Sequence, residues 1–457
     1  MLAGAFIVTM DAALGDLKGD IHVVGDRIAR IGPHLASTVS PGTVIVDAAD
    51  SIIMPGLIDS HVHAWEGQLR GIAPEADFGA YAAMTHGGIA KHMRPDDIGI
   101  GQRITAAQAI NGGVTTLIDN SHNSRSAAHS DAAVEALQQT GIRAVHAVGA
   151  PAAGSGGAQL PADLLRLRAQ YFSSEDQLLS LRMFDITPSI ATWTYAMQND
   201  FDLVAEMGPW IPNLDALLAT GLLREGHTYN HCSGLTTDQW SAIAASGAAV
   251  NMAPRSDSHF GLGAFAPIIE ANRHAIQEGI SCDNELSYGY DMFTEMRTLM
   301  TIQRGLSFQL ELAGESHVPA RYGPRDVLRA ATVGGAINAG LSAAVGTIAP
   351  GKKADLVVLD LDQVNTKLFG SVVGTVVSYA GIANVDTVFI DGIVKKWAGR
   401  LVGVDYDALV TEAIGSREFL LGKVGLSLDT IRLGSTPNVP ADDEDQALHA
   451  IVSSSGH

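Results

Sequence analysis

The alternation of apolar and polar positions changes twice along the chain and divides it into three regions. Short apolar strands, broken by turns rich in Gly and Asp, fill the first 50 residues. A similar pattern returns far downstream, in the segments Val345–Asp360 and Val385–Lys396. These two β-rich pieces flank one long insert. The pattern therefore predicts a small composite β-sandwich built from both ends of the chain.

The long insert alternates between helix-like and strand-like segments. Four predicted helices each precede a buried strand, and they cover Ile104–Ala109, Ser130–Thr140, Thr237–Ser246 and Ile268–Glu278. Such alternation predicts parallel strands with crossover helices, most simply an α/β fold of the (β/α)₈ barrel type with its site at the strand carboxyl ends. In the predicted organisation, residues 1–54 and 344–400 together form the β-sandwich, residues 55–343 form the barrel, and residues 401–457 form a C-terminal helix and a loose tail.

Composition restricts the classes of partner. An apolar content of 46% with only 17% charged residues is typical of an α/β enzyme with a large core. No apolar run reaches about 18 residues, and the first residues lack the basic start of a signal peptide. The net charge of −20, without a Lys/Arg cluster, argues against nucleic acid or an anionic membrane as partner. With only Cys232 and Cys282, no disulfide framework can form. We expect a cytoplasmic protein that acts on a small molecule.

The segment Met54–His63 ends in two histidines, His61 and His63, that stand one residue apart. The apolar pair Leu57 and Ile58 precedes them and indicates a buried strand. Because side chains alternate along a strand, both imidazoles face the same way. Pairs of this spacing also occur on surfaces and in cores. At the end of a barrel strand, however, the pair predicts metal ligands.

Two later strand ends supply further polar groups, His231 in the run His-Cys-Ser-Gly-Leu and Asp283 in the run Ser-Cys-Asp-Asn. We predict that His61, His63 and Asp283 bind one divalent ion, zinc first and iron or manganese as alternatives. Such an ion lowers the pKa of bound water to ~7. We further predict that Asp283 carries a proton from this water to a leaving nitrogen. His231 would polarise the substrate or hold the attacking hydroxide.

Four residues are predicted to bind substrate: Gln68, His122, Trp193 and His259. His122 and His259 follow predicted strands, and Trp193 lies in the loop region after another. Gln68 lies with Glu66 on the loop after the first strand. Each also has a purely structural explanation, as a core or surface side chain.

Taken together, five motifs resemble the amidohydrolase superfamily. They are P-G-L-I-D-S-H-V-H, G-G-V-T-T-L-I-D, H-C-x-x-L, S-C-D-N and V-G-T-I-A-P-G-K-K-A-D-L-V-V-L-D, and they span residues 1 to about 400 in this order. The branch that looks most similar contains cytosine deaminases and triazine chlorohydrolases. The resemblance implies hydrolysis at a carbon bonded to nitrogen, a single zinc or iron ion held by His61, His63 and Asp283, and a role for His231 on substrate and water. It also implies a homo-oligomer. No lysine stands at a strand-4 end to bridge two metal ions.

One departure concerns strand 5, from which the family supplies a further metal-binding histidine. Between Pro188 and Glu225 the chain has no histidine and no evident apolar strand, and residues 200–208 are predicted to be helical. A barrel without one strand does not close. Three accounts remain open. The given chain lacks a segment near Gly208–Pro209, or the protein has lost the strand, or Ile190–Tyr195 forms strand 5 without a ligand.

These observations leave two main hypotheses and one variant. The first is a metal-dependent hydrolase or deaminase of a small polar molecule, favoured by the joint presence of four matching polar groups. The second is a catalytically degraded barrel that serves as a binding or scaffold protein, favoured by the missing strand-5 ligand. The variant keeps the metal but performs a lyase or isomerase reaction.

Overall fold

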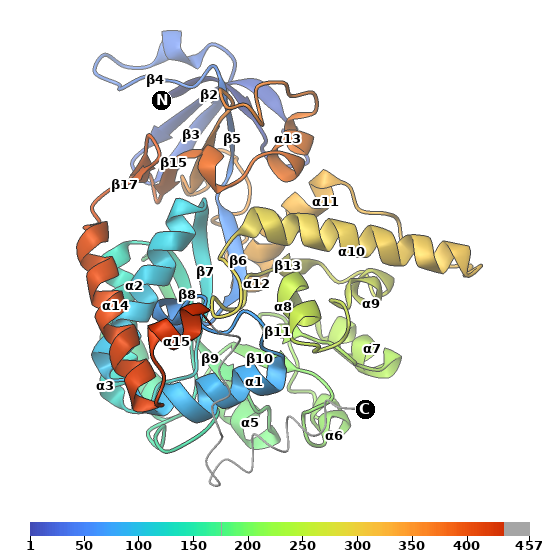
Figure 1. Cartoon of the computed structure of the whole chain (residues 1–457). Coiled ribbons are helices and arrows are strands. Elements are labelled where there is room, and N and C mark those ends of the chain that lie inside the picture. The colour runs from blue at the N-terminus through green and yellow to red at the C-terminus, as the bar shows by residue number, and fades with distance from the viewer. Residues whose placement is uncertain (175, 434–457) are drawn as a thin grey trace.

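The computed structural model describes residues 1–174 and 176–433, and these form two sheets with helices around one of them (Figure 1). The loose tail predicted after about residue 435 lies outside the described residues. In Figure 1 the barrel occupies the lower region of the molecule and the second sheet lies above it. Among the described residues, no helix has the length and apolarity of a membrane span.

The first sheet is the predicted barrel, with eight strands paired in sequence order and all neighbours parallel. Its strands are β6 (Leu57–Val62), β7 (Val114–Ser121), β8 (Arg143–Val148), β9 (Leu179–Asp185), β10 (Leu203–Met207), β11 (Thr228–His231), β12 (Ala249–Met252) and β13 (Glu278–Ile280). Helices connect successive strands, as the sequence pattern predicts.

The connecting and covering helices vary from one turn to more than five turns. They are α1 (Phe78–Ala82), α2 (Pro95–Asn111), α3 (Ala127–Thr140), α4 (Asp163–Tyr171), α5 (Ile190–Gln198), α6 (Leu214–Leu218), α7 (Thr237–Ser246), α8 (Pro254–His259), α9 (Ile268–Arg273), α10 (Met292–Leu312), α11 (Pro324–Arg329) and α12 (Gly335–Ala339). The helix predicted to reach Glu278 ends earlier, because the chain turns after α9 and Glu278 begins β13.

Strand 5 is present, and the predicted helix over residues 200–208 is wrong. Residues Leu203–Met207 form β10, which pairs with β9 on one side and with β11 on the other. Leu203 and Ala205 pack in the main core, whereas Val204 belongs to the cluster inside the barrel. The alternative strand Ile190–Tyr195 is also wrong, because these residues lie in helix α5. The eight strands need no further segment near residue 208.

The second sheet has nine strands contributed by both chain ends. Its strands are β1 (Leu2–Ile7), β2 (Leu17–Val24), β3 (Arg27–Gly32), β4 (Val46–Asp47), β5 (Ser51–Pro55), β14 (Leu356–Asp360), β15 (Val385–Ile390), β16 (Ile393–Trp397) and β17 (Arg400–Leu401). Strand β5 lies in the middle, parallel to β1 and antiparallel to β14. The prediction that the two ends of the chain build one β unit is thereby confirmed.

One helix lies between β14 and β15 in sequence, and two more follow β17. They are α13 (Val372–Ser378), α14 (Tyr406–Lys423) and α15 (Leu428–Leu433). Helix α14 corresponds to the helix predicted from the sequence near the C-terminus, and it packs against α2 on the outside of the barrel (Figure 1).

Gly56 and Arg143 lie at two of the contacts between the barrel and the second sheet. The chain passes directly from β5 into β6 through Gly56, where any Cβ would collide with the side chain of Thr115. Arg143 of β8 donates to both oxygens of Asp355, at 2.8 and 3.0 Å, and to Asp391 at 2.9 Å. Arg143 and Asp355 are almost fully buried. Because little water reaches these buried charges, each charge is stabilised mainly by its partner of opposite sign.

We expect Asp355→Asn to lower the free energy of unfolding by about 3 kcal/mol, because it leaves the buried guanidinium of Arg143 short of a counter-charge. Equilibrium urea unfolding followed by circular dichroism measures the change. Asp362→Asn is the control, since Asp362 pairs with Lys367 on the surface, where water screens the pair and its contribution to stability is small. Equal effects of the two variants would contradict the structural role of Arg143.

Candidate metal centre and active site

His61 and His63, at the end of the first barrel strand β6, point into the open end of the barrel. Their Nε2 atoms lie 3.2 Å apart, and both side chains are buried. His63 Nδ1 lies 3.2 Å from the carbonyl oxygen of Asn120. A carbonyl can only accept, so Nδ1 of His63 carries the proton and Nε2 presents its lone pair to the centre.

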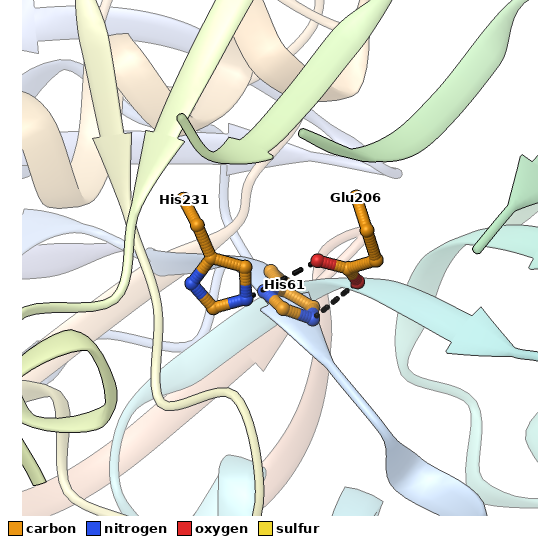
Figure 2. Close-up of side chains that lie close together, drawn as sticks. All are labelled: His61, Glu206 and His231. Atoms are coloured by element: carbon orange, nitrogen blue, oxygen red, sulfur yellow. Dashed lines mark ion pairs between the residues drawn. The ribbon is translucent and has the colours of Figure 1, made fainter. Parts of the chain in front are cut away.

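Glu206 on β10 is the strand-5 contribution to the same centre. Side chains alternate along a strand, so Glu206 points inward with Val204. Its Oε1 lies 3.4 Å from His61 Nε2, and its Oε2 lies 3.2 Å from His231 Nε2. Figure 2 shows both imidazole rings joined to this carboxylate by dashed lines. A carboxylate thus stands on the strand from which the resemblance implies a histidine.

Asp283, three residues beyond the end of β13, completes this cluster of carboxylate and imidazole groups. Its Oδ1 lies 3.3 Å from His63 Nε2 and 3.5 Å from His61 Nε2, and Ser256 donates to its other oxygen. The backbone of Asp283 has φ 66°, a left-handed conformation that Asp tolerates better than most residues.

His231 enters from the end of β11, with a left-handed backbone of φ 61°. Its Nδ1 lies 2.8 Å from Oδ1 of the fully buried Asp257. The carboxylate accepts from Nδ1, which leaves Nε2 facing Glu206 and the centre. Asp257 therefore fixes both the tautomer and the orientation of this ring.

The donor set fits a divalent cation. His61 Nε2 lies within 3.5 Å of three acceptors, on His63, Glu206 and Asp283, and one imidazole proton cannot satisfy all of them. Ligands at tetrahedral zinc distances are separated by roughly 3.3–3.4 Å, close to the 3.2–3.5 Å found among His61, His63 and Asp283. His61, His63 and Asp283 could thus hold an ion, and His61, Glu206 and His231 form a second possible group of ligands that shares His61.

The electrostatics of the cluster favour ionised carboxylates. Burial alone would raise the pKa of Asp283, but the neighbouring His61 and His63 outweigh it and hold that pKa well below its usual range. In the same way His61 and His231 overcome burial and lower the pKa of Glu206 to about 2. Burial lowers the pKa of His61 to about 4, whereas the neighbouring Asp283 overcomes burial and raises the pKa of His63 to about 9.

A second group of buried polar side chains lies behind His63. His122 Nε2 lies 3.1 Å from His63 Nδ1, the nitrogen that also faces the carbonyl oxygen of Asn120. Glu66 accepts from the hydroxyl of Tyr81 at 3.0 Å, and burial raises its pKa to about 8. His86 completes the group together with Glu66 and His122.

An open cavity lies over the cluster. Its polar lining consists of His63, His86, Glu206, His231 and Asp283, and most of the remaining lining is apolar. The catalytic and metal-binding residues predicted from the sequence (His61, His63, His231, Asp283) are therefore brought together by the fold, and three of them face this cavity.

The four predicted substrate-binding residues do not line it. Gln68 is buried and donates to the backbone of Asp97, and Trp193 stacks on Tyr229 in the core with ring centroids 5.6 Å apart. His259 packs beside Tyr288, and His122 lies behind His63. Contact of these residues with substrate stays a prediction.

Comparison with known proteins identifies the family of this chain. The sequence profile of the amidohydrolase family matches residues 52–193 and 218–394. The chain belongs to the amidohydrolase family. The unmatched segment between the two matched stretches contains β10 and Glu206, where the chain departs from the family's strand-5 histidine.

Relatives of this chain include several that are named as deaminases. The chain is 26% identical over 450 residues to the 5-methylthioadenosine/S-adenosylhomocysteine deaminase of Nitratidesulfovibrio vulgaris, covering 93% of this chain and 98% of that protein. It is 25% identical to the enzyme of the same name from Pelotomaculum thermopropionicum, over 90% and 96% of the two chains.

Solved structures share the fold. A zinc-bound adenosine deaminase from Xanthomonas campestris superposes with a TM-score of 0.78 at 23% identity, over 92% of this chain and 98% of that one. A mutant atrazine chlorohydrolase from Arthrobacter aurescens, complexed with zinc and atraton, gives a TM-score of 0.79 at 20% identity, over 91% and 99%.

Sequence reasoning missed Glu206 and Asp257. The signal for Glu206 was a single inward carboxylate at the fourth of five residues in β10, with Gly208 and Pro209 soon after the strand. Asp257 lies on α8, and its contact with His231 joins two elements that sequence spacing does not relate. The hypothesis of a degraded barrel, which depended on the loss of strand 5, is no longer favoured.

We expect Glu206→Gln to weaken zinc binding by at least about 10-fold, because an amide replaces a charged ligand oxygen. Competition with a chromophoric chelator at fixed pH measures the dissociation constant. Glu225→Gln, at an exposed position two residues before His227, is the matched control. Unchanged affinity in the Glu206 variant would remove this residue from the ligand set.

Proposed function

We propose that the chain is a metal-dependent aminohydrolase that removes the exocyclic amino group of an aminated heterocycle. Membership of the amidohydrolase family and relatives named as deaminases support hydrolysis of a C–N bond. The observation that carries the proposal is a pair of buried groups at the carboxyl ends of the barrel strands that share His61, one with His63 and Asp283 and one with Glu206 and His231. We propose one ion per chain, with zinc as the metal.

A divalent ion held by these residues would lower the pKa of a water molecule to ~7 and so supply a nucleophile at neutral pH. The chain's own residues do the rest. Asp283, ionised at neutral pH, accepts the proton of the attacking water. It then donates this proton to the amino nitrogen as the C–N bond breaks and ammonia leaves. The left-handed backbone of Asp283 directs its carboxylate toward the cavity floor.

His231 and Glu206 orient the reactants. Asp257 holds Nδ1 of His231. The Nε2 atom of His231 therefore faces the metal centre, where water would attack the ring carbon. Glu206 lies between His61 and His231 and keeps both rings in place. Burial of the cluster excludes bulk water, which strengthens each of these interactions.

We propose further that the reaction takes place in the cytoplasm and that the substrate is a free small molecule. The net charge of −20 supports a protein without nucleic-acid or anionic membrane partners. Assembly into a homo-oligomer is proposed from the family resemblance.

We expect the purified protein to contain close to one zinc per chain and to release ammonia from an aminated purine. Asp283→Asn should reduce kcat/KM by at least about 100-fold, since a positioned general acid–base contributes about 10²–10⁴. Elemental mass spectrometry and a coupled ammonia assay provide the measurements. Asp238→Asn, on the exposed first turn of α7, is the control. Full activity of the Asp283 variant would refute the assigned proton transfer.

A further inference from the structure

The cavity above the metal centre has two chemically distinct regions. Its floor consists of the imidazole and carboxylate groups already described, whereas its walls carry aromatic and aliphatic side chains. Phe78, Tyr81 and Phe260 form one aromatic wall, with Tyr81 5.0 Å from Phe260 and 6.4 Å from Phe78 between ring centroids. Trp210 and Leu262 also line the cavity. A bound molecule therefore meets polar groups at one end and apolar surface elsewhere.

The lining contains no lysine or arginine among the described residues. Nearby cationic side chains are engaged elsewhere. Arg255 donates to Glu295 at 2.5 Å and to the carbonyl oxygen of Gly289 at 2.9 Å. Arg125 donates to the backbone carbonyls of Ala153 and Ser155. Neither a phosphate nor a carboxylate on the ligand would find a cationic partner on these walls.

One wall residue outside the cluster, His86, can form a directed hydrogen bond. It is packed by the rings of Tyr81, Trp65 and His122, with centroid distances of 5.2, 6.1 and 4.9 Å. Burial lowers its pKa to about 3, so the ring is neutral at physiological pH. It can recognise one uncharged donor or acceptor on the ligand without requiring a charge there.

We infer that the substrate is a neutral aminated heterocycle whose substituent, remote from the reacting carbon, is apolar and carries no phosphate, carboxylate or ammonium group. The amino-bearing carbon lies at the polar floor, and the substituent lies against Phe78, Phe260 and Leu262. This inference rests on the proposed function, because it takes the aminated ring from it. The charge discrimination comes from the walls alone.

The name that the relatives share mentions two compounds with the same aminated ring. Comparing these two compounds tests the inference directly. 5-Methylthioadenosine ends in a neutral thioether, and S-adenosylhomocysteine ends in a zwitterionic amino acid. Adenosine 5′-monophosphate adds a dianion to the comparison. For the zinc-loaded full chain we expect kcat/KM for the thioether to exceed that for the monophosphate by at least about 100-fold, because an unpaired charge in an apolar site is strongly disfavoured. The zwitterion should fall between them.

Binding to the zinc-loaded Asp283→Asn variant, measured by calorimetry, separates this inference from the proposed function. If no compound is deaminated by the parent but the thioether still binds at least about 10-fold more tightly than the charged compounds, the proposed reaction is wrong and the inference on charge stands. Deamination with equal or better kcat/KM for a charged compound would overturn the inference and leave the proposed function intact. Failure of the neutral compound to bind would also overturn the inference.

A designed cation tests where the substituent lies. We expect Leu262→Arg to raise the ratio of kcat/KM for the monophosphate over the thioether by at least about 10-fold, because it supplies the missing partner for the phosphate. Leu262→Met, which keeps the wall apolar and of similar volume, is the control and should leave the ratio unchanged. No change in the ratio with the arginine variant would contradict the placement of the substituent against this wall.

Discussion

The structure depends on the seam where the last barrel strand meets the first. His63 donates its backbone N–H to the carbonyl of Asp283, at 2.8 Å, and Asp283 donates its own to the carbonyl of His61, at 3.0 Å. The buried carboxylate of Asp59 spans the same seam and accepts from the N–H groups of His61 and Cys282. Closure of the barrel and assembly of the metal ligands are therefore one event, since the same residues perform both.

The seam explains why the polar centre tolerates so much buried charge. These side chains come from three separate strands or strand ends, and only a closed barrel brings His61 Nε2 within 3.5 Å of groups on His63, Glu206 and Asp283. The hydrogen bonds from Ser256 to Asp283 and between His231 and Asp257 fix the side chains further. Because such groups are costly to bury unpaired, their arrangement is favourable only with a cation or protons among them.

The fold and half of the site could be predicted because their signals are local. The spacing of His61 and His63 and the strand–helix alternation depend on neighbours in sequence. Strand β10 was missed because five residues between two turns carry little periodicity, and the inward carboxylate of Glu206 interrupts them. Trp193 was expected near substrate, but its indole N–H bonds to buried Asp185 in the core, a contact that sequence does not reveal. Asp257 was missed for the same reason.

The composite sheet has a consequence for the order of events during synthesis. Strand β5 hydrogen-bonds to β1 on one edge and to β14 on the other, and the whole barrel separates β5 from β14 along the chain. At about 5–20 residues per second, the ribosome needs roughly 15–60 s to add the residues between Pro55 and Leu356. During this interval the β14-facing edge of β5 has no partner, and an exposed strand edge is a template for aggregation. The nascent N-terminal strands therefore require either protection by a chaperone or early shielding by the barrel as it folds beside them.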